Sequence, residues 1–186
     1  MLTNRVARRM RSVTGSVIPA SRVTVGISIP LMFAKTLRIK QWTKNLLLFA
    51  GLIFARQLHN PAQLTKVIWA FAAFCMLSSA LYIFNDLLDL EKDRNHPRKK
   101  FRPLASGWLK IPLAIGIMTG LGLAGGGIAL YLNVPYFSLA ALCYLGLTVA
   151  YSLYLKRVVI VDVMTIASGF VLRAVAGALV IKVPIS

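Results

Sequence analysis

Acidic residues are scarce in this chain, which carries five Asp and Glu against 22 Lys and Arg over 186 residues, for a formal net charge of +17. Cysteine is scarce too: Cys75 and Cys143 are the two in the sequence, and they lie in separate apolar runs. So few cysteines, so far apart, argue against a disulfide framework or a cysteine-based metal site and are more typical of packed apolar side chains. The acidic residues, in contrast, are concentrated in one short stretch.

Apolar residues are abundant, at 58% of the chain, which is far more than the core of one small soluble domain could bury. Apolar runs of about 20 residues recur, and an α-helix of that length spans the ~30 Å hydrocarbon layer of a membrane. The sequence therefore predicts an all-α fold, a polytopic bundle of about five spans, in which the glycine-rich third span permits tight helix packing. The expected spans are residues 46–55, with a helix starting upstream near Ile39, and residues 64–90, 111–132, 136–155 and 158–181.

The N-terminal residues 1–36 are basic and rich in Ser, Thr and Val. A charged start followed by an apolar stretch could mimic a signal peptide, but Pro19 and Arg22 interrupt the apolar part and no convincing cleavage pattern follows. We therefore expect residues 1–36 to form a poorly ordered cytoplasmic tail and residues 37–186 to form the membrane domain. Lys44, near the start of the first span, is expected at the level of the lipid headgroups.

The positive charge of the chain is unevenly distributed. A net charge of this size is typical of nucleic-acid-binding proteins, but eighteen of the 22 basic residues fall in three segments that the expected spans place on one side: the segment through Lys44, the 92–110 loop and the 156–157 link. Basic residues favour the cytoplasmic side of a membrane and its anionic lipids. We therefore predict a multi-pass plasma-membrane protein with a cytoplasmic N-terminus, the lipid bilayer as its partner and no nucleic-acid partner.

Four of the five acidic residues lie within residues 85–93, which read N-D-L-L-D-L-E-K-D at the end of the second expected span. Asp86, Asp89 and Asp93 are spaced i, i+3 and i+7, and such positions share one face of a helix. Three carboxylates on one face repel each other, and a Mg²⁺ ion, which favours carboxylate and phosphate oxygens, would relieve that repulsion. The alternative is a solvated helix end neutralised by the basic residues of the following loop. We expect a metal site, because acidic residues are almost absent elsewhere.

Basic residues of the 92–110 loop could contact phosphate groups, although the loop is also a topological anchor. Arg102 is followed by Pro103 and then by Ser106 and Gly107, which predicts a rigid turn beside the acidic face. Arginine suits multidentate phosphate recognition, so we expect Arg102 to contact a substrate phosphate.

Two ionisable residues fall within the last expected span, where such residues mark functional sites by default. Asp162 lies one turn beyond Lys156 and Arg157, so a local salt bridge competes equally with a functional role. Lys156 and Arg157 are themselves typical of a topological anchor. Arg173 is expected to face lipid or a cavity, with a phosphate or a carboxylate as its partner.

The motif N-D-x-x-D-x-x-x-D, formed by Asn85, Asp86, Asp89 and Asp93, is followed by the motif R-P-x-x-S-G that starts at Arg102. This combination resembles the UbiA superfamily of intramembrane prenyltransferases. Within that superfamily the chain is similar to the phosphoribosyltransferases that act on decaprenyl phosphate, in residues 41–45, 93–107, 151–157, 162 and 169–173. The resemblance covers about residues 37–180.

The resemblance implies transfer of a 5-phosphoribosyl group from phosphoribosyl pyrophosphate to a polyprenyl phosphate such as decaprenyl phosphate, for the synthesis of cell-wall arabinan precursors. It implies that Asp86, Asp89 and Asp93 are catalytic and hold Mg²⁺ against the leaving pyrophosphate. It also implies substrate-binding residues, namely Lys44 for the lipid phosphate, and Asn85, Arg102, Tyr151, Lys156, Asp162 and Arg173. The alternative within the superfamily is transfer of a prenyl group to an aromatic acceptor.

Members of the superfamily resemble a nine-helix fold with a second acidic motif in a later cytoplasmic loop. This chain has about five expected spans and no second acidic cluster. We therefore expect it to be the N-terminal portion of such a fold, with little or no activity by itself. A non-enzymatic membrane protein, such as a transporter fragment or a lipid-binding remnant, is the alternative outside the enzyme class, because intramembrane polar residues also mark transport paths.

Overall fold

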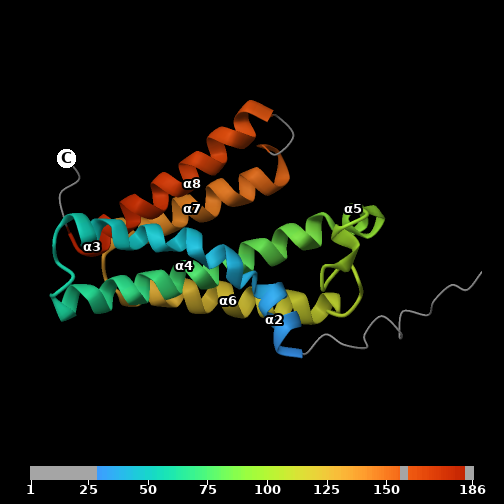
Figure 1. Ribbon diagram of the computed structural model, residues 1–186, viewed down its shortest axis with the longest axis horizontal. Coiled ribbons are helices and arrows are strands. Elements are labelled where there is room, and N and C mark those ends of the chain that lie inside the picture. The colour runs from blue at the N-terminus through green and yellow to red at the C-terminus, as the bar shows by residue number, and fades with distance from the viewer. Residues whose placement is uncertain (1–28, 156–158, 183–186) are drawn as a thin grey trace, which may run out of the picture. The chain divides into compact units, whose positions relative to one another are not determined.

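The computed structural model of the chain describes residues 29–155 and 159–182. Every regular element within these residues is a helix, which confirms the predicted all-α class (Figure 1). The chain divides into two units, residues 1–32 and 33–186, and the contacts described below lie within the second unit. Helix α2 (Ile29–Leu37) begins inside the stretch that the sequence assigned to a poorly ordered tail.

Four helices are long and apolar enough to cross a membrane: α4 (Pro61–Leu88), α6 (Ile111–Tyr131), α7 (Pro135–Leu153) and α8 (Val159–Val180). Their ends lie within three residues of the spans predicted from the apolar runs. The short helices α5 (Leu90–Asn95) and η3 (Lys99–Phe101) lie in the loop between α4 and α6. The chain is thus a multi-pass helical membrane protein, while the kind of membrane and the orientation stay predictions.

The first predicted span has a different form. Residues Ile39–Phe49 make a 3₁₀-helix, η2, and Ala50–Phe54 make a short α-helix, α3. A 3₁₀-helix rises about 2.0 Å per residue against about 1.5 Å for an α-helix, so η2 and α3 together extend over roughly 30 Å, close to the thickness of the hydrocarbon layer. A 3₁₀ stretch of this length is uncommon, and packing against α4 and α8 holds it in place.

Proline and asparagine mark where the spanning helices begin. Asn60 caps α4 by accepting hydrogen bonds at Oδ1 from the N–H groups of Ala62 and Gln63, at 3.1 and 3.4 Å, and Pro61 occupies the first turn. Prolines also stand in the first turns of α6 and α7. Proline suits this position because its fixed φ is already helical and its missing N–H has no partner there in any case.

Helix α4 is the most buried of the spanning helices and packs against α6, η2, α7 and α8. The fully buried Phe74 contacts the rings of Phe137 and Tyr144 on α7, with ring centroids 5.9 and 5.3 Å apart. In Figure 1, α6 runs alongside α4, whereas the pair of α7 and α8 diverges from α4 toward the end where α5 begins. Helix α4 therefore contributes residues both to the pocket beside α7 and α8 and to the acidic stretch at its own end.

Helix α8 approaches the element made of η2 and α3 closely at two glycines. A Cβ on Gly177 would overlap the backbone of Leu48, and a Cβ on Gly51 would lie 2.8 Å from the Cα of Ala178. A side chain at either glycine would push the two backbones apart. Small residues allow this kind of direct backbone contact in membrane helix pairs.

The glycine-rich helix α6 approaches its neighbour closely at one glycine. A Cβ on Gly125 would lie 2.9 Å from Cγ of Leu77 and 3.0 Å from the carbonyl oxygen of Ala73, both on α4. The other five glycines of α6 have open space where a Cβ would stand. The tight packing predicted for this helix is therefore confirmed at Gly125 and does not extend to the whole series.

Candidate functional site

Two carboxylates meet one guanidinium at the end of α4. The Nη1 atom of Arg102 donates hydrogen bonds to Oδ1 of Asp86 at 3.0 Å and to Oδ2 of Asp93 at 2.5 Å. Asp93 is 2% exposed, and Nζ of Lys99 lies 4.0 Å from its other carboxylate oxygen. Because a buried carboxylate is costly unless it is paired, Arg102 stabilises this end of α4 as well as being a candidate phosphate ligand.

The three carboxylates of the motif are not equivalent. Helix α4 ends at Leu88 and Asp89 follows it, but hydrogen bonding continues: the N–H of Asp89 donates to the carbonyl of Asn85 at 3.0 Å, and that of Asp93 to the carbonyl of Asp89 at 2.8 Å. On the face that the spacing predicts, the side chains of Asp86 and Asp93 lie together, and both accept hydrogen bonds from Arg102. In the described part of the chain, no three His, Cys, Asp or Glu side chains are grouped closely enough to hold a metal ion, so the three-carboxylate metal site stays a prediction.

Arg38 is a part of this site that sequence reasoning missed. Its Nη2 atom donates to Oδ1 of Asp86 at 2.5 Å, and its guanidinium lies 4.7 Å above the centroid of the Tyr82 ring. The residue stands between α2 and η2 with φ of 51° and ψ of 47°, a left-handed conformation that costs roughly 1 kcal/mol or more for a residue other than glycine. A single arginine in a basic stretch looks like a topological anchor, so no sequence signal distinguishes it.

The motif R-P-x-x-S-G builds the turn that presents Arg102. The N–H of Ser106 donates to the carbonyl of Arg102, and the N–H of Leu109 to the carbonyl of Pro103, both at 2.9 Å. Gly107 has φ of 80° and no atom within 4 Å of where its Cβ would stand, so conformation rather than space requires glycine here. The apolar residues of the turn are buried in a cluster with α4 and α6. The structure therefore contains the rigid turn that the sequence predicts.

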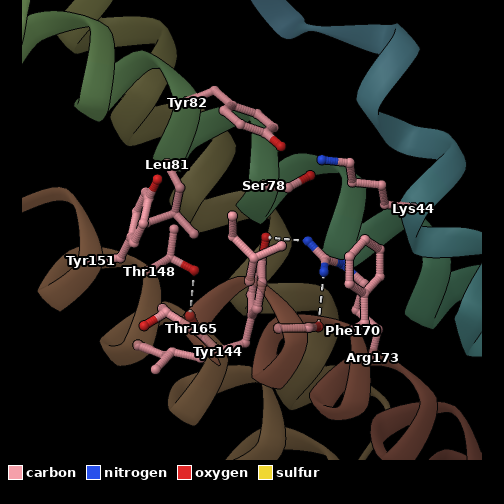
Figure 2. A pocket seen from close by; sticks show the side chains of 13 residues that line it. Lys44, Ser78, Leu81, Tyr82, Tyr144, Thr148, Tyr151, Thr165, Phe170 and Arg173 are labelled. Carbon is pink, nitrogen blue, oxygen red and sulfur yellow. Dashed lines mark hydrogen bonds between the residues drawn. The ribbon is translucent and has the colours of Figure 1, made fainter. Parts of the chain in front are cut away.

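A pocket of about 120 Å³ lies between η2, α4, α7 and α8 (Figure 2). Its polar lining includes two cations, Lys44 and Arg173, and the side chains of Ser78, Tyr82 and Tyr151. The structure thus brings together three of the predicted substrate-binding residues, Lys44, Tyr151 and Arg173. In Figure 2, Lys44 extends across the pocket toward Ser78 and Tyr82. Lys44 therefore lines a pocket between helices, and its place at the level of the lipid headgroups stays a prediction.

Arg173 is 6% exposed, and all three of its nitrogen atoms are bound within the protein. Nε donates to Oδ1 of Asn45 at 2.8 Å, Nη1 to the carbonyl of Gly169 at 2.8 Å, and Nη2 to the hydroxyl of Tyr144 at 2.9 Å. The guanidinium also faces the rings of Tyr144 and Phe170, 4.7 and 5.6 Å from their centroids. These partners are neutral, and within the described residues no carboxylate pairs with Arg173. Arg173 faces a cavity, as one of the two expectations had it, and its anionic partner stays a prediction.

Asn45 and Tyr144 are further site residues that sequence reasoning did not single out. Asn45 is fully buried, and its Nδ2 atom donates to Sγ of Cys75 and to Oγ of Ser78, both at 3.3 Å. Together with its bond to Arg173, this side chain connects η2, α4 and α8. Two sequence signals point to Asn45: it is a polar residue at the start of an apolar run, and it ends the segment 41–45 that carries the family resemblance.

The remaining predicted residues lie around these two regions. Tyr151 is on the pocket wall. Oδ1 of Asp162 is buried and accepts no hydrogen bond in the described structure. Lys156 lies outside the described residues, so its role and its salt bridge with Asp162 stay predictions. His96, the residue after α5, accepts two hydrogen bonds at Nδ1 from the backbone N–H groups of Arg98 and Lys99, at 3.2 and 3.3 Å.

The carboxylates fit the magnesium ion that the resemblance implies, by the chemistry of their donors. Asp86 and Asp93 converge on one point, and carboxylate oxygens are ligands that Mg²⁺ prefers. In this structure the guanidinium of Arg102 occupies the position between the two carboxylates. Asp86 and Asp93 are the described residues that would hold the ion, and Arg102 would then give up its hydrogen bonds to them. Asp89 stays the third ligand that the resemblance implies.

The fold and the site define a multi-pass α-helical membrane protein in which an acidic helix end lies near a cationic pocket. Asp86 is four residues beyond Tyr82, which lines that pocket. The chain belongs to the UbiA prenyltransferase family, whose model matches residues 45–185.

Curated relatives extend over most of this chain. Protein y4nM of Sinorhizobium fredii is 43% identical over 142 residues, which cover 76% of this chain and 27% of the relative. The decaprenyl-phosphate phosphoribosyltransferases of Mycobacterium tuberculosis and Corynebacterium glutamicum are 34% and 36% identical, and their matches cover 82% of this chain and 51% and 47% of the relatives. The chain spans about half the length of these two transferases and about a quarter of y4nM.

Proposed function

We propose that this site serves the transfer of a 5-phosphoribosyl group from phosphoribosyl pyrophosphate to a polyprenyl phosphate. Two relatives are named as phosphoribosyltransferases of decaprenyl phosphate. We extend that class of donor and acceptor to this chain, because its motif residues meet at one place. The role in cell-wall arabinan precursor synthesis and the cytoplasmic placement of the site are proposed on the basis of the sequence.

The convergence of Asp86 and Asp93 on Arg102 is the observation that carries this proposal. The two carboxylates come from α4 and α5 and the guanidinium from the following turn, so separate parts of the motif meet at one nitrogen atom. A solvated helix end would leave these groups exposed, yet Asp93 is buried. Such a place, where negative charge is concentrated and a phosphate-binding arginine is already present, suits a metal-bound pyrophosphate.

In the proposed reaction, an anionic oxygen of the lipid phosphate attacks C1 of the ribosyl group. A bond forms between that oxygen and C1 while the bond between C1 and the pyrophosphate oxygen breaks, and pyrophosphate leaves with the electron pair. The attacking oxygen already carries a negative charge, so no strong general base is needed. The protein therefore has to hold two phosphate-bearing substrates in line and stabilise the charge that develops on pyrophosphate.

Each motif residue has a proposed part in that task. Bound Mg²⁺, held by Asp86, Asp89 and Asp93, would neutralise the leaving pyrophosphate. Arg102 would exchange its carboxylate partners for phosphate oxygens, which its planar guanidinium suits. Lys156 is a proposed phosphate ligand on the strength of the motif.

A transfer assay tests the proposal. Membranes that carry the chain are incubated with labelled phosphoribosyl pyrophosphate, Mg²⁺ and decaprenyl phosphate, and a second arm co-expresses the unmatched half of the M. tuberculosis relative. We expect little or no labelled lipid from the chain alone and labelled lipid in the second arm, where Asp86→Asn and Asp93→Asn should each reduce its formation by at least about 100-fold. Glu91→Gln, which changes an exposed acidic residue of α5, is the matched control and should stay within about twofold.

Two outcomes would contradict the proposal in different ways. Labelled lipid that forms equally well in Asp86→Asn and Glu91→Gln would remove the acidic end from the reaction. Transfer of a prenyl group to an aromatic acceptor, without phosphoribosylated lipid, would instead establish the alternative activity of a prenyltransferase.

A further inference from the structure

One face of α4 contacts the segment around Arg38 at three successive positions. Ser79, Tyr82 and Asp86 are spaced i, i+3 and i+7 on this helix, so they share one face. Oγ of Ser79 donates to the carbonyl of Leu37 at 2.7 Å. The centroid of the Tyr82 ring lies 4.7 Å from the guanidinium carbon of Arg38, and Asp86 accepts a hydrogen bond from Nη2 of the same side chain. Backbone and side chain at this arginine are therefore both fixed to α4.

The backbone of Arg38 is held in a conformation that an arginine does not favour. Its φ of 51° and ψ of 47° are left-handed, which is unfavourable for a residue other than glycine. Hydrogen bonds beyond it keep the chain in place: the N–H of Gln41 donates to the carbonyl of Arg38 at 2.7 Å, and Nε1 of Trp42 donates to Oγ of Ser79 at 3.0 Å. Such conformations persist where the surroundings impose them, and they gather at functional sites. The direction of this guanidinium is therefore set before any ligand binds.

The two arginines at the acidic end are held in different ways. Both donate to the same atom, Oδ1 of Asp86. Arg102 comes from the loop between α4 and α6 and also donates to Asp93, and phosphate oxygens suit its guanidinium as well as carboxylates do. Arg38 is held by its backbone and by the Tyr82 ring, and among the described residues it pairs with Asp86 as its one carboxylate. Arg102 is therefore placed to exchange its partners, and Arg38 is placed to keep its own.

A fixed positive charge beside Asp86 opposes the binding of a free cation. Arg38 and Arg102 together supply the two positive charges that balance Asp86 and Asp93. A divalent cation that arrives alone meets carboxylates that are already paired, and both guanidinium groups repel it. A phosphate group that takes Arg102 as its partner removes one source of this repulsion and brings negative charge with it. The charge of Arg38 then remains to set how tightly the cation binds.

We propose that Arg38 is the positioning residue of the acidic end. It stays bound to Asp86 when Arg102 turns to a phosphate, it fixes the direction of that carboxylate, and it keeps the affinity for a free divalent cation low. The cation therefore binds together with a phosphate group and not by itself. The inference rests on the divalent-cation site of the proposed function, and it gives Arg38 a part that acts through Asp86 without contact to a substrate.

Binding of radioactive Mn²⁺ to the purified chain tests this part of Arg38. Mn²⁺ shares the preference of Mg²⁺ for carboxylate oxygens, the chain is held in nanodiscs of zwitterionic lipid, and empty nanodiscs correct for binding to the bilayer. We expect Arg38→Gln to bind Mn²⁺ at least about tenfold more tightly than the unmodified chain, and Arg38→Lys, which keeps the charge, to stay within about threefold. Lys40→Gln changes an exposed lysine of η2; it is the matched control and should stay within about twofold.

The direction of the change separates this role from a purely structural one. Damage to the fold would weaken the binding of Mn²⁺ in both Arg38→Gln and Arg38→Lys, whereas the loss of a repelling charge strengthens it in Arg38→Gln alone. Binding of Mn²⁺ by Arg38→Gln that equals that of Lys40→Gln, or is weaker, would overturn the proposal.

Inorganic pyrophosphate separates the fixed arginine from the exchangeable one. In the unmodified chain it should raise the affinity for Mn²⁺, compared at equal free Mn²⁺, at least about tenfold. Because Arg38 keeps its partner in both states, Arg38→Gln should retain this factor within about threefold. Arg102→Gln loses a phosphate partner and should reduce the factor at least about fivefold. An equal reduction in Arg38→Gln would show that Arg38 also turns to phosphate, and would overturn the proposal.

A second variant keeps the test valid if Arg38→Gln folds poorly. Arg38→Gly also removes the guanidinium, and glycine adopts the left-handed conformation of this residue without strain. We expect Arg38→Gly to have a higher Tm than Arg38→Gln and to bind Mn²⁺ at least about tenfold more tightly than the unmodified chain. An unchanged affinity in a folded Arg38→Gly variant would overturn the proposal.

These binding measurements are independent of the transfer reaction. If Mn²⁺ binds with the expected dependence on Arg38 but no labelled lipid forms in either arm of the transfer assay, the role of Arg38 stands and the proposed function fails. If labelled lipid forms but Arg38→Gln binds Mn²⁺ as Lys40→Gln does, the proposed function stands and the role of Arg38 fails.

Discussion

The two charged regions of this molecule differ in how their charges are balanced. At the end of α4, the carboxylates of Asp86 and Asp93 meet the guanidinium groups of Arg38 and Arg102, so opposite charges compensate each other within the protein. In the pocket, the buried guanidinium of Arg173 meets amide, carbonyl and hydroxyl oxygens and two aromatic rings. The first region is neutralised by its own residues, and the second carries a charge that the described residues do not neutralise.

This difference predicts different responses to ligands. Burying an unpaired charge costs several kcal/mol, of which hydrogen bonds and aromatic faces recover a part. An anion that enters the pocket therefore gains an attractive partner without breaking a contact within the protein. A cation that enters the acidic end has to displace a bound guanidinium. We expect a divalent cation to bind there best together with a phosphate group that takes Arg102 as its own partner.

A substitution that disrupts the pocket and leaves the acidic end intact should lower the free energy of unfolding most. Gly177→Ala places a Cβ against the backbone of Leu48 and would push η2, with Lys44 and Asn45, away from α8. Because neither backbone can move aside easily, we expect a loss of more than about 3 kcal/mol in the free energy of unfolding. Unfolding in mixed detergent and SDS micelles measures it. Gly126→Ala, with open space at its Cβ, is the control and should change stability by less than about 1 kcal/mol; equal losses would show that the close approach is absent.

Removing a positive charge from the acidic end of α4 should cause the next largest loss of stability. Arg102→Gln leaves the buried Asp93 beside Asp86 without its principal partner, which should cost about 1–3 kcal/mol. Hydrogen exchange should also rise in residues 90–102, because Arg102 ties this segment to α4. Arg98→Gln changes an exposed arginine of the same loop and should cost less than about 0.5 kcal/mol. Similar losses in the two variants would show that the charge balance at Asp93 does not depend on Arg102.

Removing one neutral acceptor from the pocket should have the smallest effect. Tyr144→Phe deletes the hydroxyl that accepts from Nη2 of Arg173 at 2.9 Å and leaves a buried donor unpaired, which should cost about 1 kcal/mol in the free energy of unfolding. Tyr136→Phe, at a residue of the same helix that is 70% exposed, controls for the chemistry of the substitution. A loss in Tyr136→Phe as large as in Tyr144→Phe would contradict the part given to this hydrogen bond.

The spans and the acidic motif could be predicted from the sequence because each is a local pattern. An apolar run fixes the ends of a spanning helix such as α7 within a few residues, since the bilayer sets its length. The spacing of Asp86 and Asp93 likewise fixes their common face. The 3₁₀ form of η2 could not be predicted, because it depends on how closely Gly51 and Gly177 bring η2, α3 and α8 together.

The inward orientation of the basic residues could not be predicted either. Arg38 and Lys44 stand in a basic stretch at the start of the first expected span, where the charge pattern indicates anchoring, and for Lys44 the resemblance adds the lipid phosphate as a ligand. Their aromatic neighbours, Tyr82 and Phe170, are far along the chain. For the same reason the sequence pointed to a functional Arg173 but could not show that its hydrogen-bond partners are neutral groups.

The Tm of Asn45→Asp tests the contrast between the two regions most directly. The substitution replaces the amide oxygen that accepts from Nε of Arg173 with a carboxylate of nearly the same shape, so it supplies the pocket with the counter-ion that it lacks. We predict a Tm that is higher by at least about 2 °C. A Tm equal to or lower than that of the unmodified chain would contradict the claim that the pocket carries a positive charge that the described residues do not balance.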